Sequence, residues 1–361
     1  MAGILNSMEH LKFVTKKPKV LRRIVDGYFR TIVLRQRRLR TIDWGITYRC
    51  NFRCEMCSAY HLMRNKKNQG KKELTVEQIK SVWEQAKKLG VIHVNLTGGE
   101  PMLRGMDELC QIIRNFEPDK FLISMVTNGS LVKEDDIRRL KEAGLDTLQL
   151  SLESMDPETH DRIRNHKGSY EKLMDCMKWA KKYGLNICLS AVLTKDNFGE
   201  MEKIMDFAKN EGVFFLVNPA SSSGAWQGRE EKKLTKDHLD KYSKILKVPH
   251  VRADTILNFS GKSGCPGGVE RIEITAYGEV MTCPHVQISY GNVLQEPLEK
   301  IYKRMSNFMP LKCFSPVCKH VFDEDYKDFL IRPIENVTEL PISIFEHPSV
   351  RDNEKLKKSL K

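Results

Sequence analysis

Short β-rich runs alternate with amphipathic helical stretches from about residue 42 to residue 217, and this alternation constrains the fold more than any other feature. The β-rich runs are Ile42–Thr47, Val91–Thr97, Phe121–Thr127, Thr147–Leu152, Leu185–Leu193 and Val213–Val217. Helical periodicity marks Thr75–Leu89, Glu134–Ala143, Tyr170–Tyr183 and Glu200–Lys209, and glycines follow several such stretches at positions 90, 144, 184 and 212. Glycine commonly ends a helix in this way. Repeated strand–helix units predict parallel strands, here an α/β fold with a partial parallel (β/α)6 barrel.

Chemistry in such a barrel belongs at the carboxyl ends of the strands and in the loops that follow them. Four polar or glycine-rich segments fall there: Asn51–Cys57, Gly98–Pro101, Asn128–Gly129 and Ser151–Glu153. A Ser/Gly-rich loop, Asn218–Arg229, follows the sixth strand and could be a mobile lid or a linker.

The rest of the chain divides by composition. We expect a basic amphipathic N-terminal helix in residues 1–41, the barrel in 42–230, a small α+β unit in 231–330 and a C-terminal tail in 331–361. The small unit has a hairpin signal at Tyr277–Gly278 and a helical stretch from about Pro297 to Met305. In the tail, Ile342, Ile344 and Phe345 are expected to dock on the body.

The cysteines are expected to bind metal or to pack in the core. No apolar run approaches the ~18 residues that span a bilayer, and no signal-peptide pattern opens the chain, so we expect a cytosolic protein. A reducing compartment makes a disulfide framework from ten cysteines improbable. Cys110, Cys176 and Cys188 stand alone in periodic segments, as small buried hydrophobes do.

Cys50, Cys54 and Cys57 follow the first strand with the spacing CxxxCxxC. Three thiolates on one loop can wrap a corner of a 4Fe–4S cluster, which normally takes four cysteine ligands. The missing fourth ligand would leave one iron open to a substrate. A zinc site completed by His61 is the alternative that spacing alone leaves open.

The segments CNFRCEMC and TGGEP (Thr97 to Pro101), together with TNG after the third strand and SLES after the fourth, resemble the radical S-adenosylmethionine (SAM) superfamily over residues 42–220. The resemblance implies that Cys50, Cys54 and Cys57 are the catalytic cluster ligands. It implies SAM contacts at Gly98, Gly99, Glu100, Pro101, Asn128, Ser151 and Glu153, the first three at the methionine amino group and the last two near the ribose. Met56 stands where many members have an aromatic residue beside the adenine, and methionine should serve there by packing.

The activity that this resemblance implies is reductive cleavage of SAM to methionine and a 5′-deoxyadenosyl radical, which abstracts hydrogen from an unactivated carbon. A reductase or ferredoxin would supply the electron. The protein itself supplies binding, orientation and exclusion of side reactions. A non-catalytic iron–sulfur or zinc scaffold would not need the GGEP segment beside the three cysteines.

A second group of cysteines, Cys265, Cys283, Cys313 and Cys318, lies in the C-terminal unit near Gly278. This segment resembles the SPASM and twitch extensions of radical SAM enzymes. A full SPASM extension uses about seven cysteines for two clusters, so four imply one auxiliary 4Fe–4S cluster with every iron ligated. Zinc is the alternative. His285 and His320 are the next candidates should one cysteine not be a ligand.

The N-terminal segment carries most of the positive charge. Residues 1–42 contain eleven Lys/Arg and two acids, a net charge of +9 out of +13 for the chain. An apolar stripe runs from Val20 to Val33 on this predicted helix. Such a helix is typical of a membrane surface, with packing on the barrel as the alternative. Binding to nucleic acid is not expected, because no aromatic residues are interleaved with the basic ones.

The substrate follows least directly from the sequence. The terminal helix and the auxiliary cluster favour a membrane lipid or other hydrophobic chain, modified oxidatively or by C–C bond formation by an enzyme peripheral on the membrane. The alternative is a SPASM/twitch-type maturase that cross-links a ribosomally made peptide.

Overall fold

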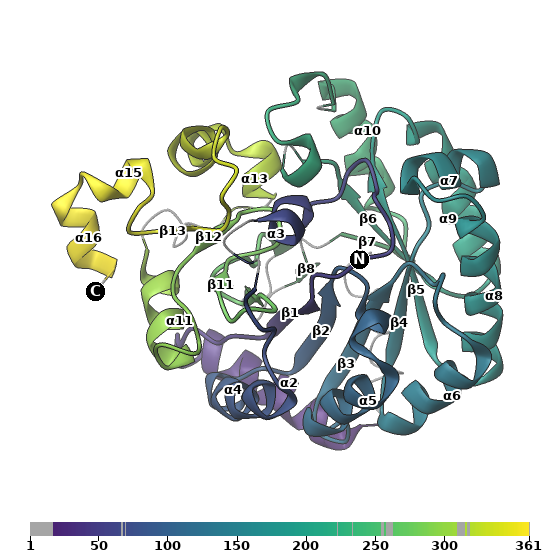
Figure 1. Ribbon diagram of the computed structural model, residues 1–361, viewed down its shortest axis with the longest axis horizontal. Coiled ribbons are helices and arrows are strands. Elements are labelled where there is room, and N and C mark those ends of the chain that lie inside the picture. The colour runs from purple at the N-terminus through teal and green to yellow at the C-terminus, as the bar shows by residue number, and fades with distance from the viewer. Residues whose placement is uncertain are drawn as a thin grey trace.

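A sheet of parallel strands forms the centre of the molecule in a computed structural model, which describes residues 17–65, 68, 70–221, 223–232, 234–253, 256–257, 263–308, 315 and 318–360. Nine strands have the order β11-β10-β1-β2-β3-β4-β5-β6-β7 (Figure 1). They are β1 (Thr41–Thr47), β2 (His93–Gly98), β3 (Leu122–Thr127), β4 (Thr147–Ser151), β5 (Asn186–Leu193), β6 (Phe214–Pro219), β7 (Val251–Arg252), β10 (Arg271–Ile274) and β11 (Val280–Met281). Only the β10–β11 pair is antiparallel. The predicted partial parallel barrel is confirmed.

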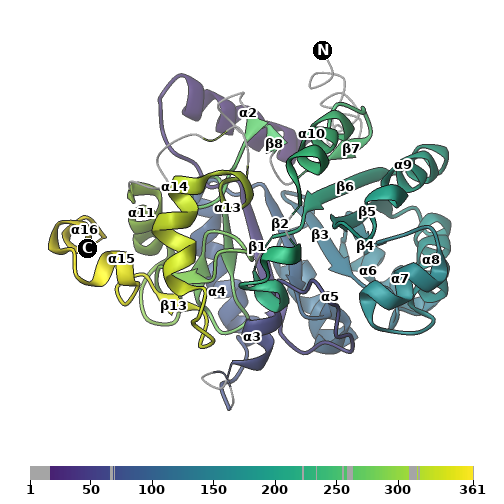
Figure 2. The ribbon, with the colours of Figure 1, turned by 90° about the horizontal axis from the view of Figure 1, so that it is seen from above.

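Helices cover the outer side of the curved sheet, as Figure 1 shows. The helices that connect the strands are α4 (Val76–Leu89), α5 (Met106–Asn115), α6 (Glu134–Ala143), α7 (Pro157–Arg164), α8 (Ser169–Lys182), α9 (Met201–Asn210) and α10 (Lys236–Ile245). The short α3 (Tyr60–Arg64), between β1 and α4, lies instead at one end of the barrel (Figure 1 and Figure 2). Before the barrel comes α2 (Pro18–Ile32). Among the described residues, no helix is both long enough and apolar enough to cross a bilayer.

Helix α4 shows how local sequence sets these elements. Thr75 and Gln78 form a capping box at its start, and its C-cap, Gly90, has a φ of 104°, where glycine avoids the Cβ penalty. Its inner face buries Trp83, whose ring lies 4.8 Å from the rings of both Phe116 and Phe121. The helix is thereby fixed to the outside of the sheet by tightly packed aromatic contacts.

The C-terminal segment adds strands to both edges of the barrel sheet. Strand β7 pairs with β6, and β10 runs parallel to β1. Strands β10 and β11 form the hairpin that was predicted around Tyr277–Gly278. The sheet therefore continues past residue 230, where we placed a domain boundary, and the division into domains stays a prediction.

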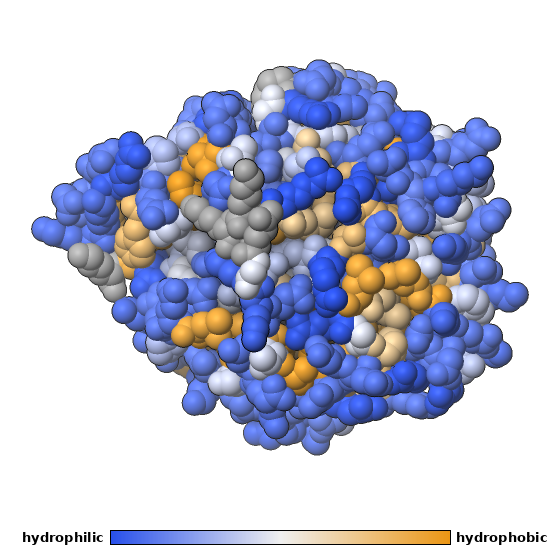
Figure 3. Space-filling model, in the orientation of Figure 1, coloured by the Kyte–Doolittle hydropathy of each residue, from blue (hydrophilic) through white to orange (hydrophobic). Residues whose placement is uncertain are grey.

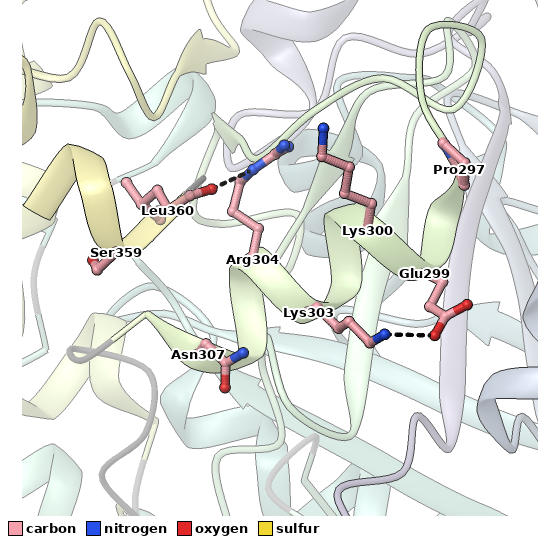
Figure 4. Close-up of a pocket in the computed structure, with 8 residues that line it drawn as sticks. All are labelled: Pro297, Glu299, Lys300, Lys303, Arg304, Asn307, Ser359 and Leu360. Atoms are coloured by element: carbon pink, nitrogen blue, oxygen red, sulfur yellow. Dashed lines mark hydrogen bonds and ion pairs between the residues drawn. The ribbon is translucent and has the colours of Figure 1, made fainter.

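The remaining helices and strands flank that hairpin in the chain, with β8 and β9 before it and the others after it. They are β8 (Ile256–Leu257), β9 (Ser263–Gly264), β12 (Ile288–Ser289), β13 (Ile342–Ser343), α11 (Leu298–Asn307), α13 (Lys319–Phe322), α14 (Glu324–Tyr326), α15 (Pro348–Arg351) and α16 (Glu354–Leu360). The tail docks as expected, because β13 pairs with β12 and Ile344 is fully buried. At its end, Nε of Arg304 on α11 donates to the carbonyl oxygen of Leu360 at 2.8 Å (Figure 4).

Candidate active site

A cavity of about 260 Å³ opens at the carboxyl ends of the strands, next to α3. Figure 3 views the molecule from the side of α3, where several apolar patches interrupt a largely hydrophilic surface. Of the predicted site residues, the cavity is lined by Cys50, Cys54, Cys57, Gly98, Gly99, Glu100, Asn128, Ser151 and Glu153. Met56 lines it too, whereas the buried Pro101 begins the short 3-10 helix η2 (Pro101–Arg104) outside the lining, and His61 also lies outside it.

The three cysteines of the first group lie on one loop between β1 and α3. Burial raises the pKa of each thiol, and the charges of Cys54 and Cys50 help to raise the pKa of Cys57 to about 12. Three neighbouring half-buried thiolates therefore need a cationic partner, and bound iron supplies that charge. The donor set fits an iron–sulfur cluster held by three protein ligands.

Two glycines let the end of β2 approach this cysteine loop closely. A Cβ on Gly98 would lie 2.1 Å from the carbonyl oxygen of Thr47, and one on Gly99 2.2 Å from that of Arg49. The Gly99 N–H instead donates to Thr47 at 2.7 Å. No larger residue fits either position, which explains the Gly-Gly pair in physical terms.

Glu100 is buried and joins the ends of β2 and β3. Its carboxylate accepts hydrogen bonds from the Thr127 hydroxyl at 2.7 Å, the Asn128 N–H at 2.9 Å and the Met102 N–H at 3.2 Å. A carboxylate has about four lone-pair positions, so one is left for a ligand. Glu100 therefore acts on the site largely by fixing its walls.

Replacing Glu100 by alanine is expected to destabilise the protein by about 2–5 kcal/mol, because three donors, two of them backbone N–H groups, lose their partner. SAM affinity should fall together with stability. Thermal unfolding and anaerobic SAM titration measure the two effects. Glu108→Ala, which changes an exposed ion pair with Arg104 on the same segment, is the matched control. Wild-type values for both quantities in Glu100→Ala would contradict this role.

Arg164, at the end of α7, was not predicted from the sequence. Its Nη1 lies 3.2 Å from Oε1 of Glu153, and Oε2 of Glu153 accepts from the Val192 N–H at 2.9 Å. Burial opposes the charge of Arg164, but the Cys54 thiolate and the Glu153 carboxylate raise its pKa. A permanent cation thus lines the cavity beside the cluster ligands.

The floor of the cavity is polar, which was also not predicted. Arg271 on β10 pairs with Asp43 on β1, and the Asn95 side-chain amide donates to Asp43 at 3.1 Å. Ser124 in turn donates to Asn95 at 2.8 Å. Burial and the charge of Asp43 raise the pKa of the adjacent Glu273 to about 8, so that this carboxyl carries a proton near neutral pH.

Further polar side chains continue this lining on β4, β5 and β6, namely Gln149, Ser190 and Asn218. Barrel interiors are commonly filled by branched apolar residues. The sequence signal that could have revealed this floor is the presence of single polar residues at inward positions of otherwise apolar strands.

The Ser/Gly-rich loop after β6 packs on the cysteine loop. The Ala225 N–H donates to the carbonyl oxygen of Cys57 at 3.0 Å, and Trp226 is buried. A Cβ on Gly224 would lie 2.2 Å from that same carbonyl oxygen. The sequence left two roles open for this loop, a mobile lid or a linker. The contacts favour neither, and indicate instead a fixed wall that supports the cysteine loop.

Three cysteines of the second group approach one another. Cys283 is half-buried, and desolvation together with the charges of Cys265 and Cys318 raises the pKa of its thiol. The fourth predicted ligand, Cys313, lies outside the described residues. The His285 and His320 rings lie nearby, 6.0 Å apart. Pro284, next to Cys283, lines the first cavity, so the two cysteine groups flank the same space.

Comparison with known proteins places the barrel in a family. Residues 44–208 match the family model described as Radical SAM superfamily. The chain is 28% identical over 282 residues to the PqqA peptide cyclase of Rhizobium meliloti (strain 1021), covering 73% of each chain. It is 23% identical over 301 residues to the AdoMet-dependent heme synthase of Methanosarcina barkeri, covering 76% of this chain and 84% of that protein.

A solved structure shows the same fold. SuiB of Streptococcus suis, bound to its precursor peptide SuiA, has a TM-score of 0.60 to this chain at 16% identity, covering 82% of this chain and 68% of SuiB. The family match, the three-cysteine loop and the barrel together define the class: the chain is a radical SAM enzyme. Its cofactors are accordingly a 4Fe–4S cluster and SAM. This agrees with the cluster rather than the zinc alternative for the first cysteine group.

Proposed function

We propose that the chain modifies a peptide, abstracting hydrogen from a carbon of a residue held over the polar floor of the cavity. The floor is the observation that carries this proposal. Arg271 and Asn95 both donate hydrogen bonds to Asp43 there, and these groups can pair with amide groups or polar side chains. A hydrocarbon chain would instead bury these groups against apolar carbon, which costs free energy when their hydrogen bonds are not replaced.

The relatives support a peptide over a lipid. The PqqA peptide cyclase covers 73% of this chain, and the SuiB structure that shares the fold holds a precursor peptide. Our first expectation, a membrane lipid, receives no such support. The similar heme synthase is named for a product that is not a peptide, so small molecules form the second class to test.

The residues of the site have distinct roles in this proposal. Cys50, Cys54 and Cys57 hold the cluster, which when bound supplies the electron that cleaves SAM to methionine and a 5′-deoxyadenosyl radical. Ser151 and Asn128 line the same space, which supports a role for both in contacting SAM. The Asp43–Arg271 pair orients the substrate, which lies between SAM and the floor of the cavity.

Removing hydrogen leaves a substrate radical, and an oxidative product forms when that radical loses one electron and one proton. We propose that an auxiliary 4Fe–4S cluster on Cys265, Cys283, Cys313 and Cys318 accepts the electron. Pro284 lines the cavity next to Cys283, which supports a short path. The proton passes to a carboxylate of the floor, for which Asp43 is available.

Deuterium transfer tests the substrate class directly. An extract of host cells grown in deuterated medium is separated into peptide, lipid and small-molecule fractions, and each is incubated with reconstituted enzyme, SAM and reductant. The peptide fraction should place deuterium in 5′-deoxyadenosine, because hydrogen abstracted from substrate carbon is carried there. Mass spectrometry of 5′-deoxyadenosine is the measurement.

Asp43→Asn provides the control, since it keeps the cavity shape but removes the charge that pairs with Arg271. SAM cleavage without substrate should persist in this variant, while deuterium transfer falls. Transfer from the lipid or small-molecule fraction alone would overturn the peptide proposal.

A further inference from the structure

Helix α2 and the two residues that follow it carry most of the exposed large apolar side chains in the described part of the chain. Five of the seven lie on it or directly after it, with exposed fractions of 46–60%: Val25, Phe29, Ile32, Val33 and Leu34. The spacing of the first four, i, i+4, i+7 and i+8, places them on one face of the helix. Soluble proteins rarely expose apolar side chains in such contiguous groups outside interaction sites.

The opposite face of α2 is firmly attached to the barrel. Val20 and Gly27 are buried in that contact. The Arg23 guanidinium lies 4.3 Å from the centre of the Phe121 ring and donates to the carbonyl oxygen of Val91 at 3.1 Å. Lys17 pairs with Asp146 at 2.6 Å. The predicted apolar stripe is thus divided: one edge faces the barrel, and the other stays outside.

Charge identifies the kind of partner that fits the outer edge. Arg22, Arg35 and Arg37 are exposed around the stripe, and none forms an ion pair within the described residues. The only acid on α2, Asp26, is already paired with Arg30 at 2.9 Å. An apolar strip with a basic rim fits an anionic amphipathic surface. A second copy of this chain would present the same positive charge and repel.

The position of α2 decides how such a surface would face the active site. Its contacts are with Val91, Phe121 and Asp146, which directly precede β2, β3 and β4, so α2 lies at the amino ends of the strands. The cavity opens at the carboxyl ends. Figure 2 shows α2 and α3, which follows the cysteine loop, on opposite sides of the molecule.

We infer that the outer face of α2 anchors the enzyme on an anionic lipid bilayer, with the mouth of the active site turned away from the membrane. The nine residues from Val25 to Val33 span eight helical rises, about 12 Å at 1.5 Å per residue, which is enough to lie in the interface and too short to cross the bilayer. Anionic lipid attracts each nearby arginine by about 1 kcal/mol. The membrane is then a tether, and substrate arrives from the aqueous side.

Vesicle flotation of the full chain, purified anaerobically, tests the anchor. Vesicles of phosphatidylcholine alone and of phosphatidylcholine mixed with phosphatidylserine are compared at low and high salt. The protein should float only with the anionic vesicles, and salt should release it, because exposed charges are screened. Val25→Asp/Phe29→Asp should weaken binding roughly a hundredfold or more, since two side chains lose their burial in lipid. Its rate of SAM cleavage should stay at the wild-type value.

Leu131→Asp is the matched control, because Leu131 is also exposed but follows β3 at the active-site end. It should float like wild type. The proposed membrane anchor is wrong if the double variant floats as well as the wild type, or if the full chain does not bind anionic vesicles. Loss of a dimer in the double variant, seen by sedimentation, would instead assign the face to a second copy. Flotation needs no substrate, so its outcome is independent of the proposed function.

Discussion

Replacing Cys50, Cys54 and Cys57 together by alanine is expected to abolish SAM cleavage and to lower the iron content from about eight to about four atoms per chain. The three thiols are the only cysteines that line the cavity in the described part of the chain. Without them no open iron faces the SAM site, so the loss of activity should be complete rather than partial. Iron analysis and formation of 5′-deoxyadenosine by the anaerobically reconstituted protein measure both effects.

The matched variant is Cys283→Ala, which removes a ligand of the proposed auxiliary cluster and leaves the cavity cysteines intact. It should lose iron as well, yet keep most SAM cleavage while product formation fails, because the proposed electron acceptor would act only after hydrogen abstraction. Equal loss of 5′-deoxyadenosine and product in a folded Cys283→Ala protein would remove the electron-acceptor role. Retention of all iron by the triple variant would show that the first group holds no cluster.

The barrel could be predicted because its signals are local. Each of the six predicted strands overlaps an observed one, and the helix over Glu134–Ala143 was predicted with the bounds that α6 has. Strand β7 and the pairing of the hairpin strand β10 with β1 were not predicted, since β7 and β10 span only two and four residues and are held by pairing with β6 and β1. Such short strands have too few residues to show a period of their own.

The candidate site divides in the same way. Its cysteines and glycines stand in short motifs, and these segments come together because the strands before them are parallel. The contribution of Arg164 depends instead on α7 folding back so that an arginine more than a hundred residues after the cysteine loop faces it. A polar residue on an amphipathic helix normally points to solvent, so nothing in the sequence separates Arg164 from its exposed neighbour Arg162.

Helix α2 shows a limit of periodicity. The pattern from Val20 to Val33 predicted one apolar stripe but not which edge would meet the barrel. Which edge packs on the barrel depends on Asp146 and the Phe121 ring, which lie about a hundred residues further along the chain. Lys17 forms an ion pair with Asp146, and the Arg23 guanidinium lies over the Phe121 ring. The contacts show packing on the barrel, one of the two alternatives left open, for one edge of the helix, and they leave its other apolar edge exposed.

Replacing Arg164 by methionine is expected to weaken SAM binding roughly 10- to 150-fold. Within the described residues its one hydrogen bond is to Glu153, so other N–H groups of the guanidinium are available to a carboxylate in the cavity, such as that of SAM. A charge-assisted hydrogen bond contributes about 1.5–3 kcal/mol, which corresponds to that range of affinity. Anaerobic calorimetric titration of SAM is the measurement.

The same substitution should also lower the reduction potential of the cluster. Removing a buried positive charge beside Cys54 makes an added electron less favourable, and it leaves the Glu153 carboxylate buried without its partner. Arg164→Lys keeps the charge and should restore most of the potential but less of the affinity, because lysine lacks the planar fork of donors. Arg162→Ala, on the exposed side of α7, should change neither quantity. A purely structural role for Arg164 would lower stability in both Arg164 variants alike and leave the potential of the folded fraction unchanged.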